Sequence, residues 1–279
     1  MYIRCWGSRG SIPVSGPEYN NYGGDTTCIE IRTSRGEVIV VDAGSGIRQL
    51  GIKLIKEKIK TIVHLFTHVH LDHTIGFPFF APCYSRDTRI TIYGRPFGHS
   101  SFKETLHGVI QAPYFPVDLL GLPAALSFKD IGKRPFALGQ VKVSSIPLNH
   151  PNGAIGFRFE ENGKAFVFLT DNELSDTRPG TLTFADFVDF CSGAELLIHD
   201  AEYDTNEYPH FEGWGHSTYP EVVDLGIAAG VKRLGLFHIN NRRTDKDMDT
   251  IVAKARALIR KRKTAMRCFG VSSRFEVTL

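Results

Sequence analysis

Leu65-Phe66-Thr67-His68-Val69-His70-Leu71-Asp72-His73-Thr74-Ile75-Gly76 is the stretch from which the fold can be inferred. An apolar run over residues 61–66 leads into it and ends abruptly in three histidines and one aspartate. Side chains alternate along a strand, so the first two histidines project to one side, and a turn would bring the aspartate and third histidine in from another direction. Imidazole and carboxylate groups suit Zn²⁺, Mn²⁺ and Fe. Four such groups in six residues favour a metal site over a polar surface loop.

The pattern His68-x-His70-x-Asp72-His73 resembles the signature of the metallo-β-lactamase superfamily of metallohydrolases. Four further motifs occur in the order that this family has, and each follows an apolar run. They end at Asp42, His150, Asp171 and His238. The resemblance covers nearly the whole chain. It implies an α/β fold, an αββα sandwich of the metallo-β-lactamase type, with a metal centre at one edge.

The resemblance also implies two divalent metal ions per chain, with Zn²⁺ as the default and Mn²⁺ or Fe as alternatives. Asp42 matches the aspartate that usually steadies the metal loop from behind the ligands. The implied ligands are His68, His70 and His150 for one metal, Asp72, His73 and His238 for the other, and Asp171 as the bridge between them.

Length, composition and charge bound the possibilities. The chain has 279 residues, 42% of them hydrophobic, which allows one large α/β domain over residues 1–279. A net charge of +3 neither demands nor excludes a nucleic-acid partner. The amino terminus lacks the regions of a signal peptide, and no apolar run is long enough to cross a bilayer. Five cysteines without a CxxC pair favour idle thiols in a reducing cytosol, so we expect a cytoplasmic protein without a membrane partner.

Hydrophobic periodicity predicts alternating strands and helices along the chain. A helix should begin at the capping box Thr218-Tyr219-Pro220-Glu221 and end at Gly230. Strands are predicted over 1–6, 28–32, 37–41, 61–66, 89–93, 141–147, 154–160, 165–169, 196–198 and 233–237, and further helices over 46–58, 182–191 and 245–263.

Residues 98–123 carry a helical stretch followed by a segment that places two prolines between aromatic residues. Proline cannot continue a helix, so this second part is predicted to be irregular. Two interpretations remain open: a short apolar lid or loop over the cleft, or a surface through which the chain forms a homodimer.

The glycine-rich turn Gly7-Ser8-Arg9-Gly10-Ser11-Ile12-Pro13 lacks the full pattern of a mononucleotide-binding P-loop. On residues alone it is a tight turn. In the family that the chain resembles, the corresponding loop borders the metal cleft. Ser8, Arg9 and Ser11 are therefore candidate substrate contacts.

Gly213-Trp214-Gly215-His216-Ser217-Thr218 is a second informative stretch. In the phosphodiesterase branch of the superfamily, a Gly-His-Ser-Thr segment supplies a histidine that faces the cleft. The segment His199-Asp200-Ala201-Glu202 resembles the motif that orients this histidine in ribonuclease Z, although Asp200 stands where that family commonly has glutamate. The resemblance therefore implies a catalytic His216 oriented by Asp200, against the alternative of a purely structural histidine.

Together with these residues, the resemblance implies a dinuclear phosphodiesterase that acts on a small or cyclic phosphodiester through a metal-bridging hydroxide. Two metals suit this chemistry because they prepare the nucleophile and neutralise the phosphoryl oxygens. Asp72 could accept or orient the proton of the nucleophile. Signatures of a lactamase or of glyoxalase II are lacking.

Two other functions are weighed against this one. Ribonuclease Z grips tRNA with a long basic arm, whereas residues 98–123 are short, apolar and poor in Lys and Arg. A nucleic-acid substrate is therefore the less favoured alternative, in the form of a ribonuclease Z-like RNA-processing nuclease. The second is a non-catalytic binding module that retains the fold.

Overall fold

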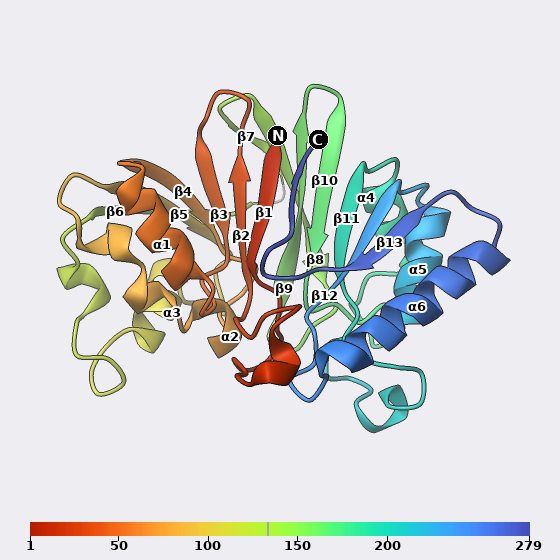
Figure 1. Cartoon of the computed structure of the whole chain (residues 1–279). Coiled ribbons are helices and arrows are strands. Elements are labelled where there is room, and N and C mark those ends of the chain that lie inside the picture. The colour runs from red at the N-terminus through yellow and green to blue at the C-terminus, as the bar shows by residue number, and fades with distance from the viewer. Residues whose placement is uncertain (133) are drawn as a thin grey trace. The chain divides into compact units, whose positions relative to one another are not determined.

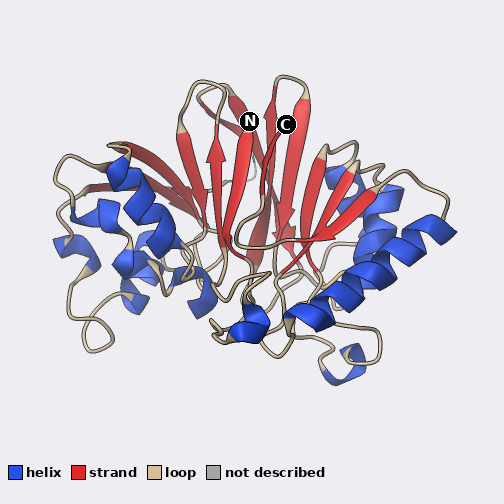
Figure 2. Ribbon diagram, viewed as in Figure 1, coloured by secondary structure: helices blue, strands red, loops and turns tan. Residues whose placement is uncertain are grey.

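The computed structural model describes residues 1–132 and 134–279. Strands and helices alternate along the chain (Figures 1 and 2). The strands form two seven-stranded sheets, each with both parallel and antiparallel neighbours. Within the described part of the chain, no helix has both the length and the apolar character needed to cross a membrane.

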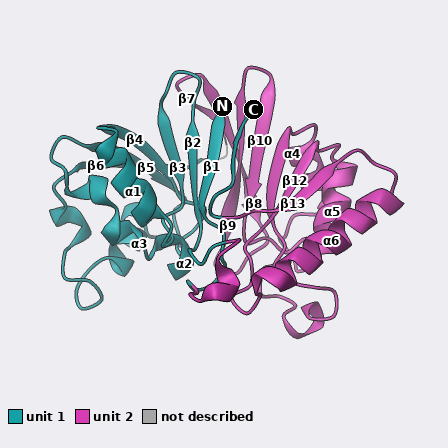
Figure 3. Ribbon diagram, in the orientation of Figure 1, with its two compact units in different colours: residues 1–13, 23–132, 273–278 teal, residues 14–22, 133–272, 279 magenta. Residues whose placement is uncertain are grey.

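The chain divides into two compact units (Figure 3). The first comprises Met1–Pro13, Gly23–Gly132 and Ser273–Thr278, and the second comprises Val14–Tyr22, Lys133–Ser272 and Leu279. Each unit contains one of the sheets. The sequence predicts a single domain over residues 1–279, and the division into two compact units does not test that prediction.

The sheet of the first unit has the order β14-β1-β2-β3-β4-β5-β6. Neighbours from β14 to β3 run antiparallel, and those from β3 to β6 run parallel. The carboxyl ends of β1, β3 and β4 therefore lie at one edge of this sheet. Its strands are β1 (Tyr2–Gly7), β2 (Cys28–Arg32), β3 (Val38–Val41), β4 (Thr61–Leu65), β5 (Arg89–Gly94), β6 (Ala125–Asp130) and β14 (Glu276–Thr278).

Helix α1 (Ile47–Lys56) covers this sheet because Ile47, Leu50 and Leu54 repeat at helical spacing and are buried in its core. Helix α3 (Phe102–Val109) begins at Ser101, whose capping box with Glu104 satisfies the first free N–H groups. The single-turn helix α2 (Leu71–Thr74) carries part of the quoted metal motif. Short 3₁₀ turns lie at Phe77–Phe79, Ala81–Tyr84 and Leu119–Gly121.

The sheet of the second unit has the order β13-β12-β11-β10-β9-β8-β7. Strands β10 to β13 are parallel, and β9 is antiparallel to both β8 and β10. Strands β8, β10, β11 and β12 consequently all end at the same edge of this sheet. Its strands are β7 (Phe136–Leu138), β8 (Val141–Leu148), β9 (Ala154–Glu161), β10 (Lys164–Leu169), β11 (Leu196–Asp200), β12 (Arg233–Phe237) and β13 (Arg267–Gly270).

Three helices with capping boxes pack on this second sheet, and their apolar faces form one core with its strands (Figure 1). Helix α5 begins after Thr218, whose backbone N–H donates to Glu221 at 3.0 Å, as predicted. The helices are α4 (Phe184–Cys191), α5 (Tyr219–Ala228) and α6 (Asp245–Lys261), and 3₁₀ turns lie at Pro17–Tyr19 and Tyr208–His210.

The predicted elements agree with the observed ones apart from their ends. Strand β11 continues past residue 198 through His199 and Asp200, and α6 ends at Lys261. Sequence pattern missed the extension of β11 because polar residues here are buried in a strand, which breaks the expected apolar run. All five cysteines are buried free thiols.

The segment at residues 98–123 is anchored by its apolar side chains. Phe102, Leu106, Ile110 and Leu119 are buried in the core of the first unit. Tyr114, between the anchors, is 78% exposed. This segment is therefore held at both ends with an exposed apolar tip. Its role as a lid or a homodimer surface stays a prediction.

His64 on β4 is a buried histidine whose ring nitrogens make no hydrogen bond within the described residues. Its ring stacks on Phe66, with centroids 4.4 Å apart, and lies near Phe77 and Phe80. Burial lowers the pKa of His64 from its ordinary 6.5 to about 3, outweighing the backbone of Asp42, which acts in the opposite direction. The folded state therefore holds this side chain neutral.

Replacing His64 by leucine should therefore stabilise the protein more in acid than at neutral pH. Below pH 6.5, His64 is protonated in the unfolded chain but stays neutral in the folded state. The wild type therefore loses stability as the pH falls toward 3. The stability advantage of His64→Leu should grow by about 1.4 kcal/mol between pH 7.5 and 5.5. Urea unfolding of both proteins at the two pH values measures this growth. His99→Leu, at an exposed histidine, is the control and should show none. A constant difference between wild type and His64→Leu would contradict the expectation.

Candidate metal centre

The first unit places four potential ligands in the loop and short helix that follow β4. His68 lies against both His70 and His73, with ring centroids 4.5 and 4.2 Å apart. His73 Nε2 lies 3.3 Å from Asp72 Oδ2. The turn of α2 brings Asp72 and His73 to the histidines of the preceding loop. The structure thus brings together the four residues of the predicted motif.

Asp42 holds this loop from behind. Its Oδ1 accepts the Thr67 backbone N–H at 2.7 Å, and its Oδ2 accepts the Thr67 hydroxyl at 2.8 Å and His73 Nδ1 at 2.9 Å. Thr67 Oγ1 in turn lies 3.1 Å from His68 Nδ1. Asp42 follows β3 with a φ of 60°, a left-handed backbone that aspartate tolerates better than most residues. These contacts hold the loop in the way expected of Asp42, whose role behind metal ligands stays a prediction.

The candidate substrate contacts in the glycine-rich turn have different surroundings. Ser8 and Arg9 are fully buried, and Arg9 Nε donates to Gly23 O at 2.7 Å. This burial favours a structural role for both residues. Ser11 is exposed, and its backbone N–H donates to Asp72 Oδ2 at 2.8 Å. Ser11 therefore helps to orient Asp72 whether or not it contacts a substrate.

The second unit places three potential ligands at the edge where β8, β10 and β12 end. Asp171 Oδ2 lies 3.8 Å from His150 Nε2 and 3.3 Å from His238 Nε2. Asp171 and His238 both have a left-handed backbone, with φ of 48° and 53°. Such conformations cost free energy and cluster at functional sites. The edge therefore gathers the three predicted ligands of this unit.

Beside these ligands, two carboxylates hold two stacked histidines. His216 Nδ1 donates to Asp200 Oδ2 at 2.6 Å, and His238 Nδ1 donates to Glu202 Oε2 at 2.8 Å. The two rings are 4.7 Å apart and nearly parallel. The predicted pair of His216 and Asp200 is thus in direct contact, and aspartate is long enough to replace the glutamate of the resembling motif.

The charges around His216 favour its protonated form. Burial lowers the pKa of His216, but Asp200 and Glu202 outweigh this effect and raise the pKa to about 9. Glu202 Oε2 lies 3.4 Å from His216 Nδ1 in addition to its bond with His238. At neutral pH the imidazole of His216 therefore carries a proton on Nε2 as well as the Nδ1 proton that it donates in the hydrogen bond to Asp200.

The loop that carries His216 requires its glycines and a glutamate that the sequence analysis missed. Gly215 has a φ of 89°, and a Cβ there would lie 2.1 Å from His150 Nδ1. Glu173 accepts the backbone N–H groups of Gly213 and Gly215, both at 2.8 Å. Glu173 stands two residues after Asp171, which is the only signal in the sequence that could have indicated it.

Two asparagines join the loops of this edge, and both were missed as well. Asn149 Nδ2 donates to Glu173 O at 3.1 Å, and its backbone N–H donates to Asn172 Oδ1 at 2.9 Å. Ser217 Oγ donates to Asn172 O at 2.5 Å. Each of these residues neighbours a predicted site residue. The site residues are therefore held by their own sequence neighbours as well as by strand ends.

The histidine hydrogen bonds fit a metal site. Nδ1 of three proposed ligands faces an oxygen that can only accept: His73 faces Asp42, His150 faces Gly215 O at 3.0 Å, and His238 faces Glu202. Nδ1 must then carry the proton, which leaves the Nε2 lone pair as the ligand atom of a neutral imidazole. Oxygen partners of this kind are typical behind metal-binding histidines. Divalent metals therefore suit the donor set of both units.

A model of the beta-lactamase superfamily domain matches residues 37–239. This chain belongs to that superfamily. The matched range contains every residue proposed above as a ligand. Membership confirms the family that the sequence motifs indicated.

Individual members of the superfamily resemble the chain over most of its length. It is 26% identical over 256 residues to a ribonuclease Z of Methanothermobacter thermautotrophicus, covering 74% of this chain and 78% of that one. The metallo-β-lactamase fold protein YhfI of Bacillus subtilis superposes with a TM-score of 0.73, at 14% identity and 99% and 98% coverage. A diphosphatase of the PhnP family superposes with a TM-score of 0.69, at 16% identity and 100% and 97% coverage.

These likenesses establish the fold class as the predicted α/β sandwich of the metallo-β-lactamase type. The superfamily member described here is accordingly placed among metal-dependent hydrolases, and its histidine and aspartate clusters are suited to divalent metals.

Proposed function

We propose that this protein is a dinuclear metal-dependent phosphodiesterase that hydrolyses a small or cyclic phosphodiester. The observation that carries the proposal is the pair of His216 and Asp200, joined at 2.6 Å beside Asp171 and His238. A histidine whose pKa is raised to about 9 is a proton donor at neutral pH, which is what a departing alkoxide requires.

Two divalent ions, Zn²⁺ by default and Mn²⁺ or Fe as alternatives, are assigned to ligands from both units. The oxygen partners of the histidine Nδ1 atoms support this assignment because they reserve Nε2 for the metal. In this proposal His68, His70 and His150 would hold one ion, Asp72, His73 and His238 would hold the other, and Asp171 would contribute to both.

Bound metals of this kind lower the pKa of water to about 7 and neutralise phosphoryl oxygens. The residues of the chain supply the remaining functions. Asp72, oriented by the backbone N–H of Ser11, accepts or orients the proton of the attacking water. His216 donates its Nε2 proton to the leaving oxygen, while Asp200 and Glu202 stabilise the positive charge of the imidazolium. Glu173 keeps His216 in place by holding the backbone on its amino-terminal side.

A ribonuclease Z-like nuclease is the second candidate, and a specific observation favours it. The relative with that name aligns over about three quarters of both chains, and RNA is itself a phosphodiester. The diphosphatase of similar fold favours a small substrate instead. The same residues would serve either substrate, because both reactions cleave a phosphorus–oxygen bond.

A panel of substrates separates these functions. Protein loaded with Zn²⁺ or Mn²⁺ is assayed on bis-p-nitrophenyl phosphate, cyclic nucleotides and tRNA precursors, with chelator-treated protein as the control. We expect metal-dependent turnover of bis-p-nitrophenyl phosphate and of at least one cyclic nucleotide. Efficient processing of tRNA precursors without cyclic nucleotide turnover would select the nuclease. Inactivity of the metal-loaded protein on all three would contradict an enzymatic function and favour a binding module.

A further inference from the structure

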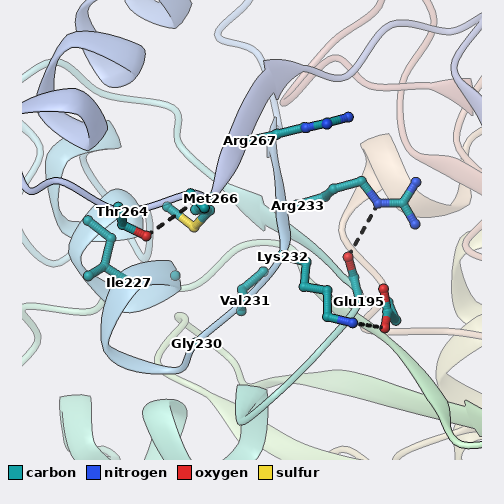
Figure 4. A pocket seen from close by; sticks show the side chains of 11 residues that line it. Glu195, Ile227, Gly230, Val231, Lys232, Arg233, Thr264, Met266 and Arg267 are labelled. Carbon is teal, nitrogen blue, oxygen red and sulfur yellow. Dashed lines mark hydrogen bonds and ion pairs between the residues drawn. The ribbon is translucent and has the colours of Figure 1, made fainter.

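A hollow of about 570 Å³ lies at the end of the second unit where β12 and β13 begin (Figure 4). Its floor includes Val231 and Met266, and Lys232, Arg233 and Arg267 line its side. Strand β12 runs five residues from Arg233 to the residue before His238. The rise of a strand therefore puts Arg233 about 16 Å from His238. A group bound here does not reach the proposed metal ligands of this unit.

A second hollow of about 350 Å³ adjoins the first. The two share Thr264, Met266 and Arg267, so they form one trough along β13 and the end of α6. Arg256 and Arg260 of α6 line the second hollow. Within residues 1–132 and 134–279, the trough is thus lined by five cations and one carboxylate, Glu195, whereas the whole chain has a net charge of only +3.

The arginines of the trough are arranged as two pairs of like charge. Arg233 and Arg267 are register partners on adjacent parallel strands, and Figure 4 shows their side chains extending in the same direction. Arg256 and Arg260 are four residues apart on α6 and therefore neighbours on its surface. Like charges in both arrangements destabilise a fold by themselves. An external anion would offset this repulsion.

Carboxylates of the described residues form no ion pair with these arginines. Glu195 Oε1 pairs with Lys232 Nζ at 2.5 Å, and only its backbone oxygen faces Arg233 Nε, at 3.4 Å. Arg256 Nε donates to the backbone oxygen of Cys268 at 2.8 Å. No ion pair is formed by any of the four arginines within residues 1–132 and 134–279. The nearby acidic residues, Asp204 and Asp224, pair with Lys254 and Arg262 instead.

The chemistry of the trough selects among anionic partners. Guanidinium groups form paired hydrogen bonds with phosphate oxygens, which makes arginine suited to phosphate recognition. A membrane surface is disfavoured because the described residues of the trough include no exposed large apolar side chain for insertion. Base stacking is disfavoured because, among the described residues, those that line the two hollows include no aromatic side chain. Two linked hollows with four arginines match a chain of several phosphates better than they match a single phosphate group.

We infer that the trough formed by Arg233, Arg256, Arg260 and Arg267 binds the phosphate backbone of a nucleic acid, separately from the proposed metal centre. The contact would be independent of base sequence, since the arginines of the trough bind phosphate oxygens and not base edges. It would also supply a positive surface of the kind that residues 98–123 lack.

Fluorescence anisotropy on the full, metal-loaded chain tests this inference. The probes are a short fluorescein-labelled RNA hairpin and the DNA hairpin of the same sequence, with inorganic phosphate as a competitor. The variant Arg260→Gln/Arg267→Gln removes two charges whose side chains make no hydrogen bond within the described residues. The matched control, Arg86→Gln/Arg89→Gln, removes two exposed arginines of the first unit. Turnover of bis-p-nitrophenyl phosphate is measured on every protein.

The wild type should bind a hairpin with an affinity that falls steeply with salt. The trough variant should bind about tenfold more weakly, and its slope of log affinity against log salt should be shallower by about 1.5. The control variant should change binding by less than about twofold. Stronger binding of the RNA hairpin than of the DNA hairpin identifies RNA as the partner. Equal binding of the two hairpins shows that the trough accepts the backbone of either nucleic acid.

Three results would overturn the inference. They are no hairpin binding by the wild type at low salt, equal effects of the two variants on hairpin binding, or a trough that binds inorganic phosphate alone and not a hairpin. Turnover of the small ester should be unchanged in the trough variant. Failure of hydrolysis with intact hairpin binding would instead contradict the proposed phosphodiesterase and leave the trough standing.

Discussion

The variant His216→Ala should lose a factor of about 10²–10⁴ in kcat on alkyl phosphodiesters while keeping its metals. The loss should be much smaller on p-nitrophenyl esters, because their leaving group hardly needs a proton. The reason lies in the contacts of His216: Asp200 and Glu202 raise its pKa to about 9, and Nδ1 is occupied by Asp200. The proton on Nε2 is therefore the one available for transfer.

Steady-state kinetics on the two ester types, together with metal content by mass spectrometry, measures this difference. His210→Ala is a matched control, since His210 is an exposed histidine of the same unit and lies outside the cluster. Equal losses on the two ester types would show that His216 is not the acid. Loss of metal in His216→Ala would show a structural or ligand role, because its Nδ1 contact with Asp200 and its stacking on His238 would then be what matters.

The sequence allowed candidate ligands to be proposed because the motif at His68 and the residues His150, Asp171 and His238 each follow an apolar run. The ends of β4, β8, β10 and β12 fall where periodicity placed them. Parallel strands bring such ends to one edge, so order along the chain is enough to gather residues within a sheet. The motif at His68 and the glycines around His216 provided the rest.

The supporting residues could not be predicted in the same way. Glu173, Glu202 and Asn149 act through backbone groups and ring nitrogens whose positions depend on loop conformation. The left-handed backbone of Asp171 and His238 also has no signature in a single sequence. The basic trough is formed by residues from β12, β13 and α6. The charges of Arg233 and Arg267 are adjacent because these two residues are register partners, and strand register could not be derived from the sequence.

Asp171→Asn should lose both bound metal and activity, because the proposal assigns this carboxylate to both ions. Asn adopts a left-handed backbone readily, so the φ of 48° at this position adds little strain to the variant. It also keeps the size of the side chain. The change therefore removes mainly the charge that the proposal assigns to bridging two metals. His150 Nε2 and His238 Nε2, at 3.8 and 3.3 Å from Asp171 Oδ2, would remain in place.

We expect the metal content of Asp171→Asn to fall from two ions per chain to one or fewer, and kcat/KM on bis-p-nitrophenyl phosphate to fall roughly a thousandfold. Metal analysis of protein purified without chelator gives the first quantity, and initial rates at saturating metal give the second. Asp189→Asn, at an exposed position of α4, carries the same chemical change and should leave both unaltered. Two ions bound to Asp171→Asn with unchanged affinity would mean that Asp171 does not bridge them. Its strained backbone would then require another explanation, because a left-handed aspartate at a strand end persists only where its surroundings hold it there.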